Sequence, residues 1–235
     1  MRKIAARWVP HHLTPEQKME RVRVASLLLR RQRREPFLDR VIAIDETWIR
    51  SYEPELKRQS AEWRHPDSPR PIKFRQSPSP VKLMLIAAYD SSGMVLAHFV
   101  PPGQTVNSEY YCHFLKRELR PALRRKRPEM ERPLILQDNA AAHRAQATQV
   151  ALSDLQWETL PHPAYSPDMS PPDFDLFGKL KEPLRGQRFR SLDDVKAAAK
   201  RVLQQLDRNG ALTGVQRLPD RWAKVVELRG EYIEG

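Results

Sequence analysis

Short apolar runs alternate with amphipathic segments along this chain, and their order predicts an α/β fold. Residues 40–49, RVIAIDETWI, form an apolar, β-branched run that is typical of a buried strand. Residues 81–100 contain two such runs around a D-S-S-G turn, which predicts a β-hairpin. Two further short strands are expected within 132–143 and at 155–161.

Capping residues and apolar periodicity place helices around these strands. Thr14 and Gln17 form a T-x-x-Q capping box with a proline between them, which predicts an N-terminal helical arm. Later helices are expected from Asn107 or Ser108, after Asp138, from Pro172, after Ser191 and near the C-terminus. Antiparallel strands followed by strands that alternate with helices predict a mixed sheet flanked by helices.

Residues 51–80 interrupt this pattern. The segment holds six prolines and many basic residues, and it shows little apolar periodicity. It is therefore predicted to be a long basic loop, and loops of this length are usually functional or disordered.

The overall charge narrows the class of partner. Lys and Arg number 41 and Asp and Glu number 29, so the net charge is +12, which indicates a polyanion such as nucleic acid. The alternative is a basic protein without such a partner. Cys112 is the only cysteine, which excludes an internal disulfide and a cysteine-based zinc site. No apolar run approaches the ~18 residues of a membrane span, so no membrane association is expected.

Three aspartates are placed to meet at one site. Asp45 and Asp138 follow predicted buried strands, and Asp173 opens a predicted helix. Sites of open α/β sheets gather at the carboxyl ends of strands. Converging carboxylates suit Mg²⁺ or Mn²⁺, and two such ions ~3.5–4 Å apart can promote in-line displacement at a phosphodiester.

Each of these aspartates also has a purely structural interpretation. Asp45 could end a strand, Asp138 could form an Asx turn with Asn139, and Asp173 could favour a helix N-terminus. The spacing of the aspartates and the sequence motifs around them favour a shared metal site. Thirty-four residues separate Asp138 from Asp173.

With AIDETWI, LQDNAAAH and LPHPAYSPDMSPPDFDLF around the three aspartates, the chain resembles the catalytic domain of a mariner-family DNA transposase. The segment ARWVPHHLTPEQK is similar to the interdomain linker of that family. GQTVNSEYY and LPDRWAKVVELRGEYIE are similar to its G-x-T-V-N segment and its C-terminal ending. The resemblance covers nearly the whole chain.

This resemblance implies an RNase H-like fold of the retroviral-integrase type. It implies a homodimer that brings two transposon ends together, cleaves them with Mg²⁺ or Mn²⁺, two ions in each active site, and transfers them into TA target DNA. Basic clusters such as LRRQRREP could serve nuclear import, so a nuclear location is expected. Asp45, Asp138 and Asp173 match the catalytic, metal-binding triad. Asp168 and Asp175, which lie close by, are expected to be structural.

The resemblance also divides the chain. Residues 1–39 would form an interdomain linker and helical arm, 40–235 the catalytic domain, and 51–80 the clamp loop that reaches the partner subunit. The residues expected to contact DNA or the partner are Trp8, His11, Trp63, Arg64 and His143, the last of which could equally face the metals or pack.

The chain departs from the family pattern at two positions and in one larger respect. Gln137 stands where the family often has His, and His12 where it has Glu. The two helix-turn-helix units with which the family reads its terminal repeats are not in this sequence, so little sequence preference in DNA binding is expected. A domesticated RNase H-like nuclease or a DNA-binding protein that no longer transposes remains an alternative.

Overall fold

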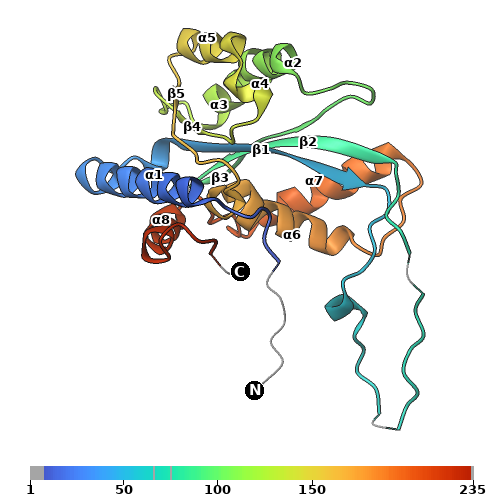
Figure 1. Cartoon of the computed structure of the whole chain (residues 1–235). Coiled ribbons are helices and arrows are strands. Elements are labelled where there is room, and N and C mark those ends of the chain that lie inside the picture. Colours follow the sequence, from blue (N-terminus) through green and yellow to red (C-terminus); the bar gives the residue numbers. More distant parts are fainter. Residues whose placement is uncertain (1–7, 66, 75, 234–235) are drawn as a thin grey trace, which may run out of the picture.

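A five-stranded mixed sheet forms the centre of the molecule (Figure 1). The computed structural model describes residues 8–65, 67–74 and 76–233. The strands follow the order β3-β2-β1-β4-β5, with the pairs β1–β2 and β2–β3 antiparallel and the pairs β1–β4 and β4–β5 parallel. Their bounds are Val41–Arg50 for β1, Lys82–Asp90 for β2, Gly93–Phe99 for β3, Leu134–Leu136 for β4 and Glu158–Thr159 for β5. The predicted strands and their mixed pairing are confirmed.

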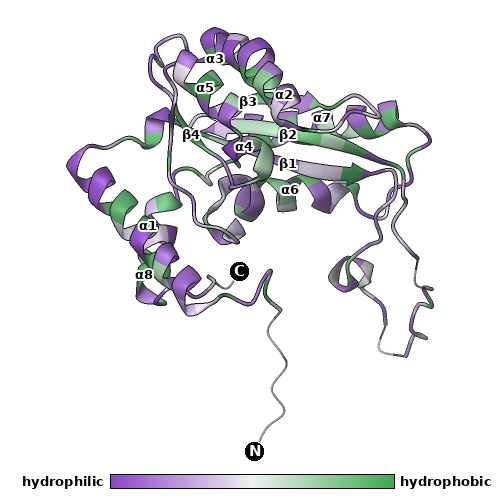
Figure 2. Cartoon of the chain, turned by 45° about the horizontal axis from the view of Figure 1, so that its top comes forward, coloured by the Kyte–Doolittle hydropathy of each residue, from purple (hydrophilic) through white to green (hydrophobic). Residues whose placement is uncertain are grey.

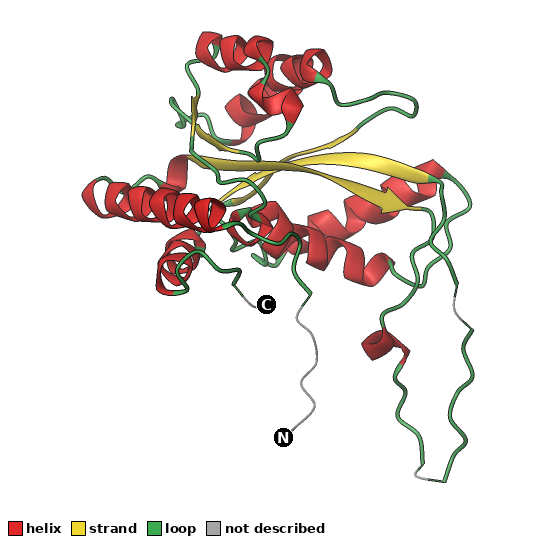
Figure 3. Ribbon diagram, in the orientation of Figure 1, coloured by secondary structure: helices red, strands yellow, loops and turns green. Residues whose placement is uncertain are grey.

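Helices cover both faces of this sheet (Figure 3). The bounds are α1 Pro15–Arg34, α2 Ser108–His113, α3 Arg120–Lys126, α4 Ala141–Arg144, α5 Gln146–Asp154, α6 Phe177–Lys181, α7 Leu192–Arg208 and α8 Leu218–Glu227. A π-helical turn, Phe114–Leu119, joins α2 to α3, and another, Pro172–Leu176, leads into α6. Side-chain caps form at Thr14, Asn107 and Ser191 as predicted. No helix in these described ranges has the length and apolar character needed to cross a membrane.

Alternation along β1 separates two apolar cores. Val41 and Ala43 face the layer formed by α1, α6, α7 and α8, whereas Ile42 and Ile44 face the layer of α2, α3 and α5. In Figure 2 the apolar positions of the helices lie toward the sheet and the hydrophilic ones toward the outside. Because successive side chains of a strand point to opposite faces, this parity also fixes the direction of the residues that follow.

The N-terminal helix shares the larger core with the rest of the chain. Val24, Ala25 and Leu28 of α1 are buried in it. The fully buried Arg21 forms two hydrogen bonds with Asp168, at 2.8 and 2.7 Å, and donates a third to the carbonyl of Gly230. An uncompensated charge would be costly at this depth, so the pair ties α1 to two distant segments.

Residues 51–80 extend away from the body between β1 and β2 (Figure 1). Their described part contains a single helical turn, Lys57–Ser60, and an isolated bridge between Tyr52 and Arg188. Trp63 is fully exposed and Ile72 is 97% exposed. The segment therefore adds little to the core of the protomer that carries it.

One predicted boundary is wrong. Asp45 was expected at the end of its strand, but β1 continues to Arg50 and pairs with β2 along its whole second half. On the β4 side pairing stops earlier, at Ala43 and Leu136. Asp45 thus lies within the β1–β2 ladder and two residues beyond the end of the β1–β4 ladder.

Candidate active site

The strand register brings Asp45 and Asp138 to the same level of the sheet. Ala43 pairs with Leu136 in the parallel ladder, so two further steps along each chain place the two aspartates opposite one another. Asp45 shares the parity of Val41 and Ala43 and therefore points toward the layer that contains α6. The π-helical turn that carries Asp173 lies against β1 in that layer.

Asp45 and Asp173 face one another. The Asp173 carboxylate is close enough to act on the ionisation of Asp45, and the Ser170 hydroxyl lies 3.5 Å from Oδ2 of Asp45. The Glu46 backbone N–H donates to Oδ1 of Asp45 at 2.7 Å. Burial, the Asp173 carboxylate and the Glu46 carboxylate together raise the pKa of Asp45 to about 9. Burial also raises the pKa of Asp173. A second ionised carboxylate beside Asp173 is therefore unfavourable unless a cation offsets its charge.

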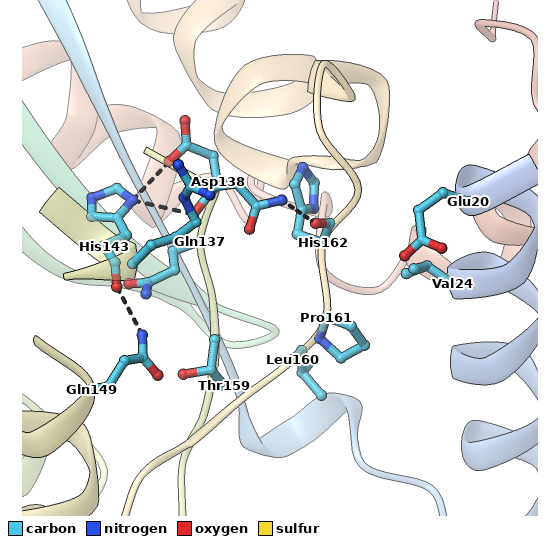
Figure 4. Close-up of a pocket in the computed structure, with 12 residues that line it drawn as sticks. Glu20, Val24, Gln137, Asp138, His143, Gln149, Thr159, Leu160, Pro161 and His162 are labelled. Atoms are coloured by element: carbon cyan, nitrogen blue, oxygen red, sulfur yellow. Dashed lines mark hydrogen bonds and ion pairs between the residues drawn. The ribbon is translucent and has the colours of Figure 1, made fainter. Parts of the chain in front are cut away.

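Asp138 is held by the segment that follows it (Figure 4). Its Oδ1 accepts hydrogen bonds from the Ala140 backbone N–H at 2.9 Å and from Nδ1 of His143 at 2.7 Å. Burial opposes ionisation, but these two bonds outweigh it and lower the pKa of Asp138. The carboxylate is thus fixed in orientation and remains ionised.

The His143 ring lies between two carboxylates. It is 2% exposed, and its Nε2 is 3.4 Å from Oε1 of Glu46. Burial disfavours the imidazolium, but the hydrogen bond to Asp138 and the nearby Glu46 carboxylate overcome it and raise the pKa of His143 to about 10. The ring also packs 4.3 Å from the Tyr111 ring, whose hydroxyl donates to Gln137 at 2.6 Å.

Sequence reasoning did not identify Glu46 as part of this site. The available signal was strand alternation, because Glu46 must point to the face opposite Asp45 and so toward α4, which carries His143. That contact required knowing which helix covers the face.

The donor set fits a hard divalent cation, although the carboxylates are not yet gathered around one point. Within residues 8–65, 67–74 and 76–233, no three His, Cys, Asp or Glu side chains stand close enough to hold an ion. Asp45 and Asp173 are paired, while Asp138 is directed toward His143. Carboxylate oxygens are the ligands that Mg²⁺ and Mn²⁺ prefer, and a cation would offset the charge that raises the pKa of Asp45.

A polar cavity of about 390 Å³ opens beside Asp138 (Figure 4). Glu20 of α1 lies on one side of it, and His162 and Asn139 line the other. The Asn139 amide donates to the His162 carbonyl at 2.6 Å. The site is therefore open to solvent next to the second aspartate.

Asp168 and Asp175 have structural partners. Asp168 binds Arg21, as described above, and also accepts from the Ile233 backbone N–H at 3.0 Å. Asp175 is buried and accepts from Lys179 at 2.6 Å and from the Gly214 N–H at 2.9 Å. Both carboxylates thus connect distant segments of the chain, as expected for structural residues.

The five predicted contact residues are dispersed. His143 lies against the acidic cluster. Trp8 is 96% exposed, and the His11 ring stacks on Tyr165 with their centres 4.0 Å apart. Trp63 is fully exposed on the long loop, where the neighbouring Arg64 pairs with Glu62.

The mixed sheet and its acidic side chains define an RNase H-like catalytic domain. Residues 53–132 match the family model described as transposase, partial DDE domain. Mariner Mos1 transposase of Drosophila mauritiana is 37% identical over 234 residues, which are 97% of this chain and 66% of that protein. The human histone-lysine N-methyltransferase SETMAR is 35% identical over 236 residues, 97% of this chain and 33% of that protein. The chain belongs to the mariner family of DNA transposases.

Solved structures agree with this assignment. The Mos1 paired-end complexes with Mn and with Mg each match with a TM-score of 0.89 at 37% identity, covering 100% of this chain and 68% of theirs. The Mos1 strand transfer complex matches with a TM-score of 0.87 at 36% identity, with the same coverage. The predicted fold and family are confirmed, and the chain spans about two thirds of Mos1.

Proposed function

We propose that this chain is the catalytic region of a mariner transposase, which cleaves transposon ends and joins them to target DNA at a TA dinucleotide. The observation that carries the proposal is that the turn carrying Asp173 packs against β1, where Asp45 and Asp138 each lie two residues beyond the end of the β1–β4 ladder. The likeness to Mos1, known in paired-end and strand transfer complexes, supports both steps.

The proposed catalytic and metal-binding residues are Asp45, Asp138 and Asp173, holding two Mg²⁺ or Mn²⁺ ions. Bound ions would activate the attacking hydroxyl and stabilise the leaving oxygen of the phosphodiester. The Mos1 complexes with Mn and with Mg support this choice of metal.

Contacts within the chain orient the carboxylates of Asp45 and Asp138. The Glu46 N–H and the Ser170 hydroxyl fix the two oxygens of Asp45. His143 fixes Asp138 from the opposite face of the sheet. These contacts set the direction of each carboxylate before any ligand arrives, which limits the reorganisation that catalysis requires.

The proposed partners are DNA and a second copy of the chain. The net charge of +12 favours DNA through release of counterions. Residues 51–80 would serve as a clamp reaching the other subunit of a homodimer, with Trp63 and Arg64 on its exposed part. Trp8 and His11 would contact DNA or the partner from a linker and arm at 1–39, which precede the catalytic domain at 40–235.

A mariner transposase acts where DNA is kept. We place this one in the nucleus, because basic clusters such as LRRQRREP are compatible with nuclear import.

The test uses the purified chain, supercoiled plasmid DNA and Mg²⁺ or Mn²⁺. Wild type should nick the plasmid and join a 3′-OH oligonucleotide duplex into it at TA, and chelation should stop both reactions. Asp45→Ala and Asp138→Ala should abolish both, while most DNA binding and the thermal transition persist. Undiminished cleavage by either variant would refute the assignment. Nicking without joining would instead identify a nuclease that no longer transposes.

A further inference from the structure

A group of cations beside Asp173 is not explained by the acidic site. Lys181 ends α6, and the Arg185 N–H bonds the Lys181 carbonyl one turn later, so the two side chains leave the same side of the chain. Arg50, at the end of β1, is among the charges that act on Lys181. Sequence reasoning did not single out this cluster.

The cluster leaves cationic donors unused. Lys181 is half-buried, and the described part of the chain offers its ammonium no hydrogen bond or ion pair. The buried Nε of Arg185 likewise has no acceptor in the described residues, and its Nη2 lies 3.6 Å from Oε1 of Glu53. Glu53 is thus a partial counter-charge for three cations.

This arrangement is unfavourable for the isolated protomer. Burial lowers the pKa of Lys181, and the neighbouring charges of Arg185 and Arg50 lower it further against the opposing effect of Glu53. A buried polar atom such as Nε of Arg185, which has no partner in the described residues, calls for an explanation. An anion bound at this cluster would supply acceptors for both Arg185 and the half-buried Lys181.

Its position indicates which anion. Asp173 and Lys181 are near enough for each to influence the other's ionisation. Arg185 also lines a cavity of about 1350 Å³, together with Tyr52, Glu53 and Phe74 of the long loop. The cluster thus adjoins Asp173 through Lys181 and this cavity through Arg185.

We propose that Lys181 and Arg185 bind a backbone phosphate of DNA adjacent to the phosphodiester held at the acidic site. This inference rests on the proposed function and deepens it. Lys supplies a point charge and Arg a planar fork, the two geometries that recognise phosphate. A strand that runs past Asp173 would satisfy the unused donors with its next phosphates and would be fixed in register for cleavage.

The first test measures DNA binding without divalent metal. Lys181→Gln and Arg185→Gln are compared with Lys200→Gln, which removes the same charge from an exposed position on α7. Each cluster variant should weaken duplex binding several-fold and reduce the slope of log K against log salt by about 0.9, the value for one lost phosphate contact. Cluster variants that match Lys200→Gln would overturn the proposal.

The second test locates the phosphate. Single neutral methylphosphonates are placed along the 3′-OH strand of the oligonucleotide duplex or along the target strand. At one position the substitution should slow joining by wild type about tenfold and have no further effect on Lys181→Gln. The strand that carries this position distinguishes a transposon-end phosphate from a target phosphate. Effects that simply multiply at every position would overturn the proposal.

Stability provides the control for a structural role. Because Lys181→Gln removes a desolvated charge without a partner, its thermal midpoint should equal or exceed that of wild type. A lowered midpoint would show that Lys181 serves the fold and would overturn the proposal. Failure of the proposed function looks different, since wild type would then neither nick nor join unmodified DNA in Mg²⁺ or Mn²⁺.

Discussion

Nδ1 of His143 lies 2.7 Å from Oδ1 of Asp138, while Nε2 of the same ring lies 3.4 Å from Oε1 of Glu46. One imidazole thus connects a carboxylate of the acidic site to a carboxylate on the opposite face of β1. The connection fixes the plane of the ring, and through the ring it fixes Asp138.

His143→Ala should therefore impair catalysis through Asp138. Loss of a partner that orients a metal ligand typically costs about 10–100-fold in metal affinity or activity. We expect the metal concentration for half-maximal nicking to rise within that range, and His143→Gln to restore part of it. His98→Ala is the matched control, because that ring bonds Tyr110 rather than the acidic site. An unchanged metal requirement in His143→Ala would contradict the positioning role.

Asp173→Asn should abolish nicking and leave the fold at least as stable as wild type. The substitution removes a carboxylate whose charge acts unfavourably on Asp45, so the repulsion between them falls. Asp168→Asn and Asp175→Asn should still nick DNA below their unfolding temperatures. The measurement pairs plasmid nicking with thermal unfolding for all three variants. A dead Asp175→Asn beside an active Asp173→Asn would show that the third ligand has been misidentified.

Asp168→Asn should lower the free energy of unfolding by about 3–5 kcal/mol, because it leaves the fully buried Arg21 without its charge partner. Replacing both, with Arg21→Met and Asp168→Asn, should recover part of that loss. The matched control is Glu20→Gln, which breaks the exposed pair with Arg23 and should cost less than about 1 kcal/mol. Urea titration measures all three. Equal losses for the buried and exposed pairs would contradict this account.

Stability should fall with pH through His162. Burial lowers the pKa of His162 to about 4, against about 6.5 in the unfolded chain. The unfolded state therefore binds a proton first as pH drops, and the contribution is present above pH 6.5 and lost toward pH 4. The difference corresponds to roughly 3 kcal/mol. His162→Gln should flatten the free energy of unfolding across this window relative to wild type, and an identical pH profile for the two would exclude the effect.

Replacing residues 60–77 with a short Gly-Ser turn should disrupt dimer or synaptic-complex assembly and spare the fold. Trp63, Ile72 and Phe74 are 105%, 97% and 82% exposed, so the protomer loses few contacts with them. Analytical ultracentrifugation with and without DNA should show the loss of the dimeric species. A collapsed thermal transition in the shortened chain would show that the loop supports the core instead.

Local signals made much of the fold predictable. The helix starts at Thr14, Asn107 and Ser191 depend on side chains that bond backbone groups three residues away, and all three form as expected. The end of β1 was misplaced because it depends on two neighbours of different length. β4 stops at Leu136, whereas β2 continues to pair as far as Arg50.

The site residues were predictable only where a sequence motif and its spacing identify them. Their spacing and the sequence motifs around them identified the three aspartates. The roles of Glu46 and of Arg21 could not be inferred, because their partners lie 97 and 147 positions away and meet them only after the sheet and its helices have assembled. Lys181 was also not identified, because its proposed partner is a DNA phosphate and leaves no pattern in the protein sequence.

The Arg21 contacts also have a mechanical meaning. This one guanidinium grips the Ser166–Asp168 turn, five residues ahead of Asp173, and the Gly230 carbonyl near the other end of the chain. Gly230 has φ +85°, and a Cβ there would meet the Lys18 carbonyl oxygen at 2.3 Å, so the two backbones are in close contact. The segment that runs from Trp8 into α1 is consequently joined through Arg21 to the turn that precedes Asp173. A displacement of that segment by a bound neighbour would therefore act on the turn next to Asp173.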